Sequence, residues 1–348
     1  MSESEEKEKK KSGCFLLGCG GCLSGCLCFI FIFVLVIVFF ISGPFEDFSG
    51  KMNNGINEES IPGFSKNSKA HLIVIPLHGI IQYGENKSGV ISPDFVAAML
   101  EKAEADPNAA GIILSIDSPG GEVNAADEIY QHIVSFRERT GLPVVALMRS
   151  IAASGGYYVA AACDYIVAGD MTLTGSIGVI ISSYNFTGFL DMIGIEGEVY
   201  KSGAMKDMLS PVRKRTKEEI AVVQELVNEC YRKCVKIVSD SRNIPFEKLL
   251  GSEMADGRIY HGKKAVSYGF VDKIGGLKDA AKVCEEFSNH QAGTLTIIKY
   301  TKSPDFLDFL LGIQGAAQNG MNVNIAVPGK TPSVELKPGR LYYLPAGI

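Results

Sequence analysis

The sequence has no long basic face and no internal repeat. Its 34 Lys and Arg are outnumbered by 39 Asp and Glu, which gives a formal net charge of −5. Proteins that bind nucleic acid usually carry a basic patch or stripe, so this charge pattern predicts no nucleic-acid partner. Because nothing repeats, we expect residues 71–300 to form one folded unit of ordinary domain size.

Residues 12–45 contain no charged side chain. Residues 29–41 are continuously apolar, and about 20 apolar residues suffice to cross a bilayer as a helix. Lysines precede this interval and Glu46 follows it. The positive-inside rule then predicts a single-pass cell-membrane anchor over 12–45, with residues 1–11 in the cytoplasm and the remainder outside. A cleaved signal peptide usually has a shorter apolar core, so we expect the anchor to stay uncleaved.

Five of the nine cysteines lie within the first thirty residues. Cys19 and Cys22 have the C-x-x-C spacing of a zinc site, but they sit in an apolar run without polar neighbours. Lipid-facing thiols, or acylation of Cys14, fit this setting better. The sequence therefore predicts no metal site and no cofactor.

Residues 46–70 are rich in Gly, Ser, Asn and Pro, which predicts a flexible tether. Beyond it, apolar runs alternate with helical patterns, which is typical of an α/β fold whose core sheet is covered on both faces. The expected strands are 72–77, 111–117, 143–148, 165–168 and 196–200, and the expected helices are 93–103, 124–138 and 154–163.

A long amphipathic helix is predicted to begin after Thr216, because Thr216-x-x-Glu219 has the pattern of a capping box. Its apolar residues include Ile220, Val223 and Val227, so we expect this helix to pack on the sheet or on a neighbouring subunit. Residues 301–348 are predicted to form a loosely structured tail.

Three glycine- and serine-bearing turns are predicted to follow strands: residues 118–121, 152–156 and 174–178. In α/β sheets, functional sites gather at the carboxyl ends of strands. Ser154 would open a short helix whose first residues are small, and the partial positive charge of a helix N-terminus favours a developing alkoxide. Ser154 is therefore a candidate nucleophile, although a serine at a helix start is often only an N-cap.

A serine nucleophile needs a base. None of the five histidines lies in a turn that resembles a triad motif. A lysine in a dry cleft is the other option, because desolvation disfavours the ammonium form. Lys206 and Lys201 lie close together in the sequence, and their chemistry alone leaves the choice between them open. Backbone amides at Gly121 and Gly155 are candidates for the oxyanion donors.

The segments SPGG, IAASGGYY, LTGSIGVI and YKSGAMKD, followed by DGRIYHGKKA, resemble in this order the SppA-type signal peptide peptidases. The resemblance runs from about residue 72 to residue 284. It implies a ClpP/crotonase-like spiral α/β fold of repeated β-β-α units, assembled into a homo-oligomer. It also implies a Ser–Lys dyad of Ser154 and Lys206, with Ser176 orienting the lysine amine and Gly121 donating to the oxyanion.

The function that follows is a membrane-anchored serine endopeptidase that degrades remnant signal peptides, with Val179, Ile180 and Ile181 lining substrate pockets. Two alternatives remain. The protein could be a broader quality-control protease of membrane proteins, or an acyl-CoA enzyme of the crotonase kind, which would have no use for a Ser–Lys pair.

Overall fold

The computed structural model describes residues 55–65, 68–84, 89–302 and 342–343. The predicted anchor, the charged N-terminus and the N-terminal cysteines lie outside these residues. Among the described residues, no helix is both long enough and apolar enough to cross a membrane.

The described strands form one mixed sheet, with the main order β1-β10-β2-β4-β5-β6-β9. Strands β2, β4, β5 and β6 run parallel to one another, whereas β1 pairs antiparallel with β10. Outside this path, β3 pairs with β2, β7 with β5 and β8, and β11 with β4. The strands are β1 (Ile56–Ser60), β2 (His71–Ile81), β3 (Val90–Ile91), β4 (Ala109–Glu122), β5 (Val144–Ala153), β6 (Tyr165–Ala168), β7 (Leu173–Gly175), β8 (Ile259–His261), β9 (Lys273–Ile274), β10 (Thr296–Lys302) and β11 (Tyr342–Tyr343).

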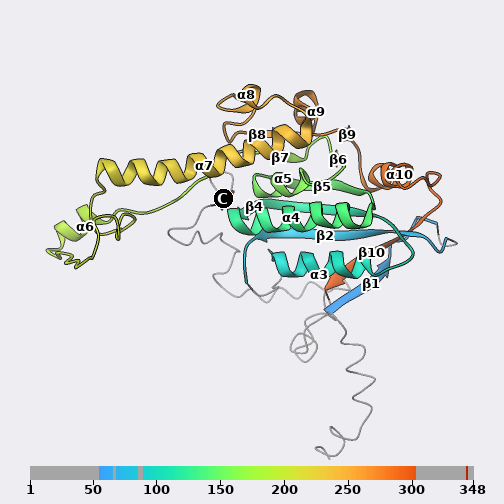
Figure 1. The fold of residues 1–348 in the computed structure, drawn as a ribbon, viewed down its shortest axis with the longest axis horizontal. Helices are drawn as coiled ribbons and strands as arrows, with labels where there is room; N and C mark the ends of the chain where they lie inside the picture. Colours follow the sequence, from blue (N-terminus) through green and yellow to red (C-terminus); the bar gives the residue numbers. More distant parts are fainter. Residues whose placement is uncertain (1–54, 66–67, 85–88, 303–341, 344–348) are drawn as a thin grey trace, which may run out of the picture. The chain divides into compact units, whose positions relative to one another are not determined.

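Helices cover both faces of this sheet (Figure 1). Two separate apolar clusters account for the two layers: one contains buried side chains of α3, α4 and α5, and the other those of α10. The helices are α3 (Pro93–Glu104), α4 (Val123–Thr140), α5 (Gly155–Ala160), α6 (Thr187–Met192), α7 (Lys217–Arg242), α8 (Phe246–Leu249), α9 (Gly262–Tyr268) and α10 (Leu277–Phe287). The prediction of an α/β fold with a sheet covered on both faces is confirmed.

Most predicted elements appear, with shifted ends. β4 and β5 extend through the residues that were predicted to be turns, so 118–121 and 152–153 lie in strands. The predicted tether is wrong in part, because residues 56–60 form β1 through backbone bonding to β10. The predicted strand 196–200 is also wrong: these residues have no regular structure and are exposed. None of the strands in the described part of the chain pairs with them, so this apolar pattern joins no described sheet.

Helix α7 begins as the sequence predicts: Thr216 Oγ1 accepts from the Glu219 N–H, and Glu219 accepts from the Thr216 N–H. Its buried side chains beyond the first turn all lie in its C-terminal half, where Cys234, Val235 and Val238 pack into the core. The N-terminal half projects beyond the sheet, with α6 beside it (Figure 1). Residues 179–215, here called the arm, connect the sheet to this projecting half.

Candidate active site

The three glycine- and serine-bearing segments meet in the structure. β4 pairs with β5 at Ser118 and Ala152, and β5 pairs with β7 at Ala153 and Gly175. The backbone N–H of Ser154 then donates to the Gly175 carbonyl over 2.8 Å. The three segments therefore come together where β4, β5 and β7 end.

Glycine is required at two of these positions because other backbone atoms lie too close for a side chain. A Cβ on Gly156 would lie 2.6 Å from the Ser118 carbonyl oxygen, and one on Gly121 would lie 1.8 Å from the Ile81 carbonyl oxygen. The small residues therefore let β2, β4 and the first turn of α5 pack directly against one another.

Ser154 has an unusual backbone and an unusual side chain. Its φ of 54° and ψ of −116° lie outside the ordinary regions for a residue with a Cβ. The residue is only 2% exposed, and its Oγ has no hydrogen-bond partner among the described residues. Strain and an unsatisfied buried hydroxyl both cost stability, and such features concentrate at functional sites. The simple N-cap interpretation fails, because the Ser154 side chain makes no capping bond.

Helix α5 is firmly held, so the position of Ser154 is fixed by its surroundings. The Tyr157 hydroxyl donates to the Phe270 carbonyl over 2.9 Å, and the Tyr158 hydroxyl donates to Asp127 over 2.6 Å. Burial raises the pKa of both tyrosines, which keeps the hydroxyls protonated as donors.

Two of the supporting residues predicted from the sequence lie near Ser154: Gly155 follows it in the chain, and Ser176 follows Gly175, whose carbonyl accepts from the Ser154 N–H. Gly155 is the first residue of α5 and is buried. Ser176 directly follows Gly175, is 3% exposed, and also has a positive φ of 51°. Its backbone N–H donates to the Arg258 carbonyl over 2.7 Å, so Ser176 is held against the segment before β8.

Lys206 does not reach Ser154 within one chain. Its segment lies in the arm, where the Lys206 N–H donates to the Gly203 carbonyl over 3.1 Å in a series of turns. The residue is exposed, so the predicted dry cleft is not formed by the single chain. Since Ser154 Oγ bonds to no described residue, the lysine amine is not its partner here.

Lys201 is engaged elsewhere. Its Nζ donates to the Asp207 carboxylate over 2.6 Å and to the Ala204 carbonyl over 3.0 Å. The Lys201 amine is thus occupied by two acceptors, whereas Lys206 lies exposed on the same arm. The structure thus gives a physical reason to prefer Lys206, which the sequence chemistry left open.

No histidine takes the place of lysine in the described part of the chain. His78 lies 3.5 Å from Ser115 Oγ, and His132 lies 3.6 Å from Glu128. Neither contact involves Ser154. The same residues contain no group of three or more His, Cys, Asp or Glu that could hold a metal ion.

The end of β4 beyond Ser118 pairs with a further strand that the sequence did not reveal. β4 pairs with β5 only as far as Ser118, whereas Gly121 and Glu122 continue beyond the end of β5. There β11 pairs antiparallel, with Tyr343 opposite Gly121 and Tyr342 opposite Glu122. The predicted loose tail therefore contains a short strand, and this edge accepts an extended peptide.

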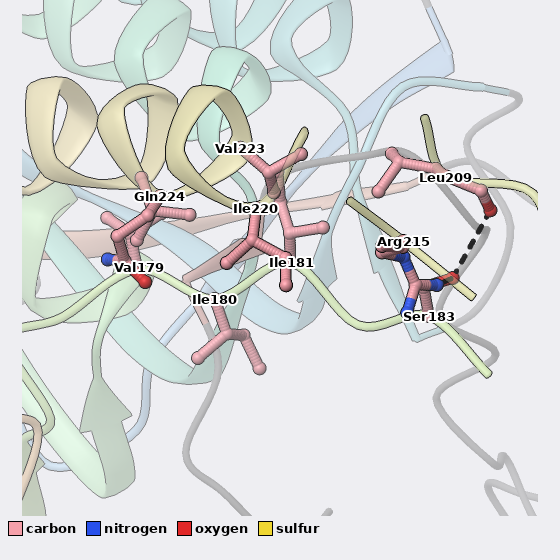
Figure 2. A pocket seen from close by; sticks show the side chains of 10 residues that line it. Val179, Ile180, Ile181, Ser183, Leu209, Arg215, Ile220, Val223 and Gln224 are labelled. Atoms are coloured by element: carbon pink, nitrogen blue, oxygen red, sulfur yellow. Dashed lines mark hydrogen bonds between the residues drawn. The ribbon is translucent and has the colours of Figure 1, made fainter. Parts of the chain in front are cut away.

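The apolar residues 179–181, predicted to line a substrate pocket, line a groove beside α7 that does not include Ser154. Figure 2 shows Ile181 beside Ile220 and Val223 of α7, Ile180 pointing away from the helix, and Ser183, Leu209 and Arg215 at the other end of the groove. The groove encloses about 410 Å³. Ile220 remains 54% exposed, so the N-terminal half of α7 has an apolar face that the single chain leaves open.

Comparison with known proteins matches this architecture. The model of peptidase family S49 matches residues 137–291, and the Clp protease family model matches residues 70–167. A protein of Enterococcus faecium with the provisional name signal peptide peptidase SppA is 37% identical over 233 residues, 66% of each chain. Protease 4 of Salmonella typhi is 30% identical over 69% of this chain and 38% of its own length.

A ClpP1 mutant from Listeria monocytogenes matches with 16% identity and a TM-score of 0.40, over 60% of this chain and 93% of its own. The matched regions span less than two thirds of the length of the Enterococcus and Salmonella relatives. The S49 match includes Ser154, Ser176 and Lys206, and the Clp match includes Gly121, Ser154 and Gly155. These matches identify residues 137–291 as a region of the peptidase family S49 type.

Proposed function

We propose that this protein is a serine endopeptidase in which Ser154 is the nucleophile and Lys206 the general base. The observation that carries the proposal is the buried, strained Ser154, whose Oγ has no partner among the described residues. A structural serine in such a place would normally be hydrogen-bonded. A nucleophile whose base is supplied from outside the single chain can lack such a bond.

The chemistry then follows from a neutral amine beside this hydroxyl. Lys206 takes the Ser154 proton as Oγ attacks a peptide carbonyl, and backbone amides at Gly121 and Gly155 stabilise the oxyanion. The protonated lysine then gives the proton to the leaving amine. A water molecule, deprotonated in turn by the lysine, releases the acyl group and restores the serine. Ser176 would orient the lysine amine.

We propose that the base comes from a second copy of the chain. Lys206 is exposed on the arm, while the Ser154 hydroxyl is buried and unpaired, so each half lacks its partner. The arm is rich in exposed apolar side chains, which mark an interaction surface when they are contiguous. They include Tyr184, Phe186, Phe189, Met192, Ile193, Ile195, Val199, Tyr200 and Met205.

Assembly of several copies of the chain would cover the apolar side chains of the arm and the open apolar face of α7. The arm of one protomer would pack on its neighbour and bring Lys206 to that neighbour's Ser154, which also removes the amine from water. Burial of this kind disfavours the ammonium form and so favours a base. The groove between residues 179–181 and α7 would then lie within or beside this interface.

Substrates are proposed to bind as extended chains along β4. The pairing of β11 with Gly121 and Glu122 supports this mode, because an extended segment there lies antiparallel to β4, just past Ser118, which pairs with Ala152. Strand addition binds through main-chain hydrogen bonds and leaves sequence preference to side-chain pockets. Remnant signal peptides, which are short and apolar, fit this mode.

The location of the enzyme is part of the proposal. Residues 12–45 would anchor the chain in the cell membrane, with the N-terminus in the cytoplasm and the catalytic unit outside. The anchor would confine the active site to the bilayer surface, where cleaved signal peptides remain.

The test compares cleavage of a synthetic signal peptide by the wild type, Ser154→Ala, Lys206→Ala and Lys201→Ala. We expect no turnover for Ser154→Ala or for Lys206→Ala. We expect partial activity for Lys201→Ala, because this change removes only the amine that holds Asp207. Lys236→Ala, in an exposed pair with Asp240, is the matched control. Retention of activity in Lys206→Ala would contradict the assignment. Loss of fluorophosphonate labelling in Ser154→Ala would also exclude the acyl-CoA alternative.

A further inference from the structure

The turns that carry Lys206 are exposed at residues 203–206 and half-buried at 207–210, and none of these residues belongs to the hydrophobic core, so core burial does not hold them in place. Three backbone bonds define them: Lys206 to Gly203 over 3.1 Å, Met208 to Met205 over 3.2 Å, and Ser210 to Asp207 over 2.9 Å. Such turns are easily deformed unless side chains fix them. A general base must nevertheless be placed accurately, because a displacement of about 1 Å can cost about 100-fold in rate.

The residue after Lys206 is held by an arginine fork. Arg213 Nε donates to one oxygen of Asp207 over 2.7 Å, and Arg213 Nη2 donates to the other oxygen over 2.7 Å. Nη2 also donates to the Asp207 backbone carbonyl over 3.1 Å. Bidentate pairing of this kind fixes orientation as well as distance.

The other side of the same guanidinium binds the start of α7. Arg213 Nη1 donates to Glu219 over 3.0 Å, and Nη2 donates to its second oxygen. Glu219 is 2% exposed and belongs to the capping box with Thr216. The turns around Lys206 are thereby tied to the first turn of a 26-residue helix, which is a rigid element.

Charge gives this arrangement a second consequence. Asp207 is adjacent to Lys206, and a free carboxylate beside an amine favours the ammonium form, which cannot act as a base. Here Arg213 and Lys201 both donate to Asp207, and these bonds lower the pKa of its carboxyl group. The positive charges of Lys201 and Arg213 thus neutralise the negative charges of Asp207 and Glu219.

The other charged groups nearby do not replace this pairing. Arg215 donates to Ser183 and to the Tyr184 carbonyl, across the arm. Lys214 contributes its backbone carbonyl to Arg213. Earlier in the arm, before Lys201, Glu198 accepts from the Tyr200 hydroxyl.

We propose that Arg213 and Asp207 are positioning residues of this peptidase: their ion pair fixes the Lys206 turns to α7 and prevents Asp207 from pairing with the Lys206 amine. This inference rests on the proposed role of Lys206 as the base. It assigns no contact with substrate to either residue.

The test measures the pH dependence of kcat/KM for Arg213→Gln, Asp207→Asn and the double variant. Arg213→Gln leaves Asp207 without its fork, so we expect kcat to fall by about 100-fold with little change in KM. We also expect the acidic limb of the profile to move up by about one pH unit, because the Asp207 carboxylate, then held by Lys201 alone, can turn to the Lys206 amine and stabilise its ammonium form. In the double variant the limb should return to its wild-type position while kcat stays low.

Arg139→Gln is the matched control, because Arg139 makes a similar bidentate pair with Glu104 far along the chain from the arm. If the pH limb of Arg213→Gln stays at its wild-type position, or if its kcat equals that of Arg139→Gln, the inference is wrong. Lys206→Ala is assayed alongside: activity in that variant would overturn the proposed base itself. Circular dichroism and light scattering identify a variant that fails to fold or assemble. If Arg213→Gln fails in this way, Arg213→Lys takes its place, because lysine retains the charge without the fork. Folded Arg213→Lys should show the same loss of kcat.

Discussion

The backbone N–H of Ser154 donates to the Gly175 carbonyl over 2.8 Å, and this bond joins the segment of the proposed nucleophile to the segment that carries Ser176. Both serines have positive φ values, 54° and 51°. Two residues with strained backbones, each directly following one of two paired strands, β5 and β7, are thus held together by the end of the sheet.

The strain at Ser154 predicts a trade-off between stability and activity. Ser154→Gly removes the Cβ that makes this backbone unfavourable, so we expect it to stabilise the fold by about 1 kcal/mol while abolishing turnover. Ser154→Ala, which keeps the Cβ, should abolish turnover without that gain. Thermal unfolding of both variants measures the difference, and equal melting temperatures would contradict the strain argument.

The open face of α7 predicts that assembly depends on its N-terminal half. Ile220→Asp places a charge in the apolar groove, so the assembled protein should dissociate and lose activity together. Arg232→Ala, on an exposed side chain of the same helix outside the groove, is the control. Light scattering gives the mass of each variant. An assembled but inactive Ile220→Asp protein would indicate that the groove binds substrate instead of a subunit.

The pairing of β11 with β4 predicts that the C-terminus competes with substrate. Truncation before residue 341 should free the edge at Gly121 and Glu122 and lower KM, with kcat unchanged. Steady-state kinetics on a signal-peptide substrate measure both values. A truncated protein with the KM of the full chain would show that β11 does not occupy the substrate path.

The ionic anchor of the arm has a defined pH range. Hydrogen bonds from Arg213 lower the pKa of Glu219 to about 2 and also lower the pKa of Asp207. A carboxylate with a lowered pKa stabilises the fold above its unfolded-state pKa, near 4, and loses that contribution as the pH falls toward its folded-state value.

We therefore expect the arm to remain anchored from neutral pH down to about pH 4, and to loosen between about pH 4 and pH 2. Hydrogen exchange of residues 203–210 at several pH values measures this directly. Loosening near pH 6 would contradict the assigned ion pairs and would offer another cause for the acidic limb of the activity profile.

Much of this site follows from local sequence patterns. The apolar runs around residues 72–77, 111–117 and 143–148 predict the parallel strands, because strands buried on both faces must be continuously apolar. Thr216 and Glu219 predict the start of α7 for an equally local reason, the pairing of cap groups three residues apart. Small residues in 118–121 and 152–156 indicate the close approach of backbones.

The remaining features depend on contacts that local patterns do not contain. The pairing of residues 56–60 with β10 and of 342–343 with β4 joins segments far apart in sequence, each too short to be recognised alone. The exposure of Lys206 also could not be predicted, because YKSGAMKD says nothing about which surface the arm covers. The amphipathic pattern of α7 predicted a packed face, but within one chain half of that face remains open.

The central claim is that Ser154 of one protomer works with Lys206 of another. The most direct test mixes Ser154→Ala with Lys206→Ala, each inactive alone, unfolds and reassembles them in equal amounts, and measures cleavage of a signal-peptide substrate. Random assembly joins an intact serine to an intact lysine at about a quarter of the sites, so the account predicts about a quarter of the wild-type rate. No activity in a mixture of confirmed assembly would contradict it, because a dyad within one chain cannot be restored by mixing.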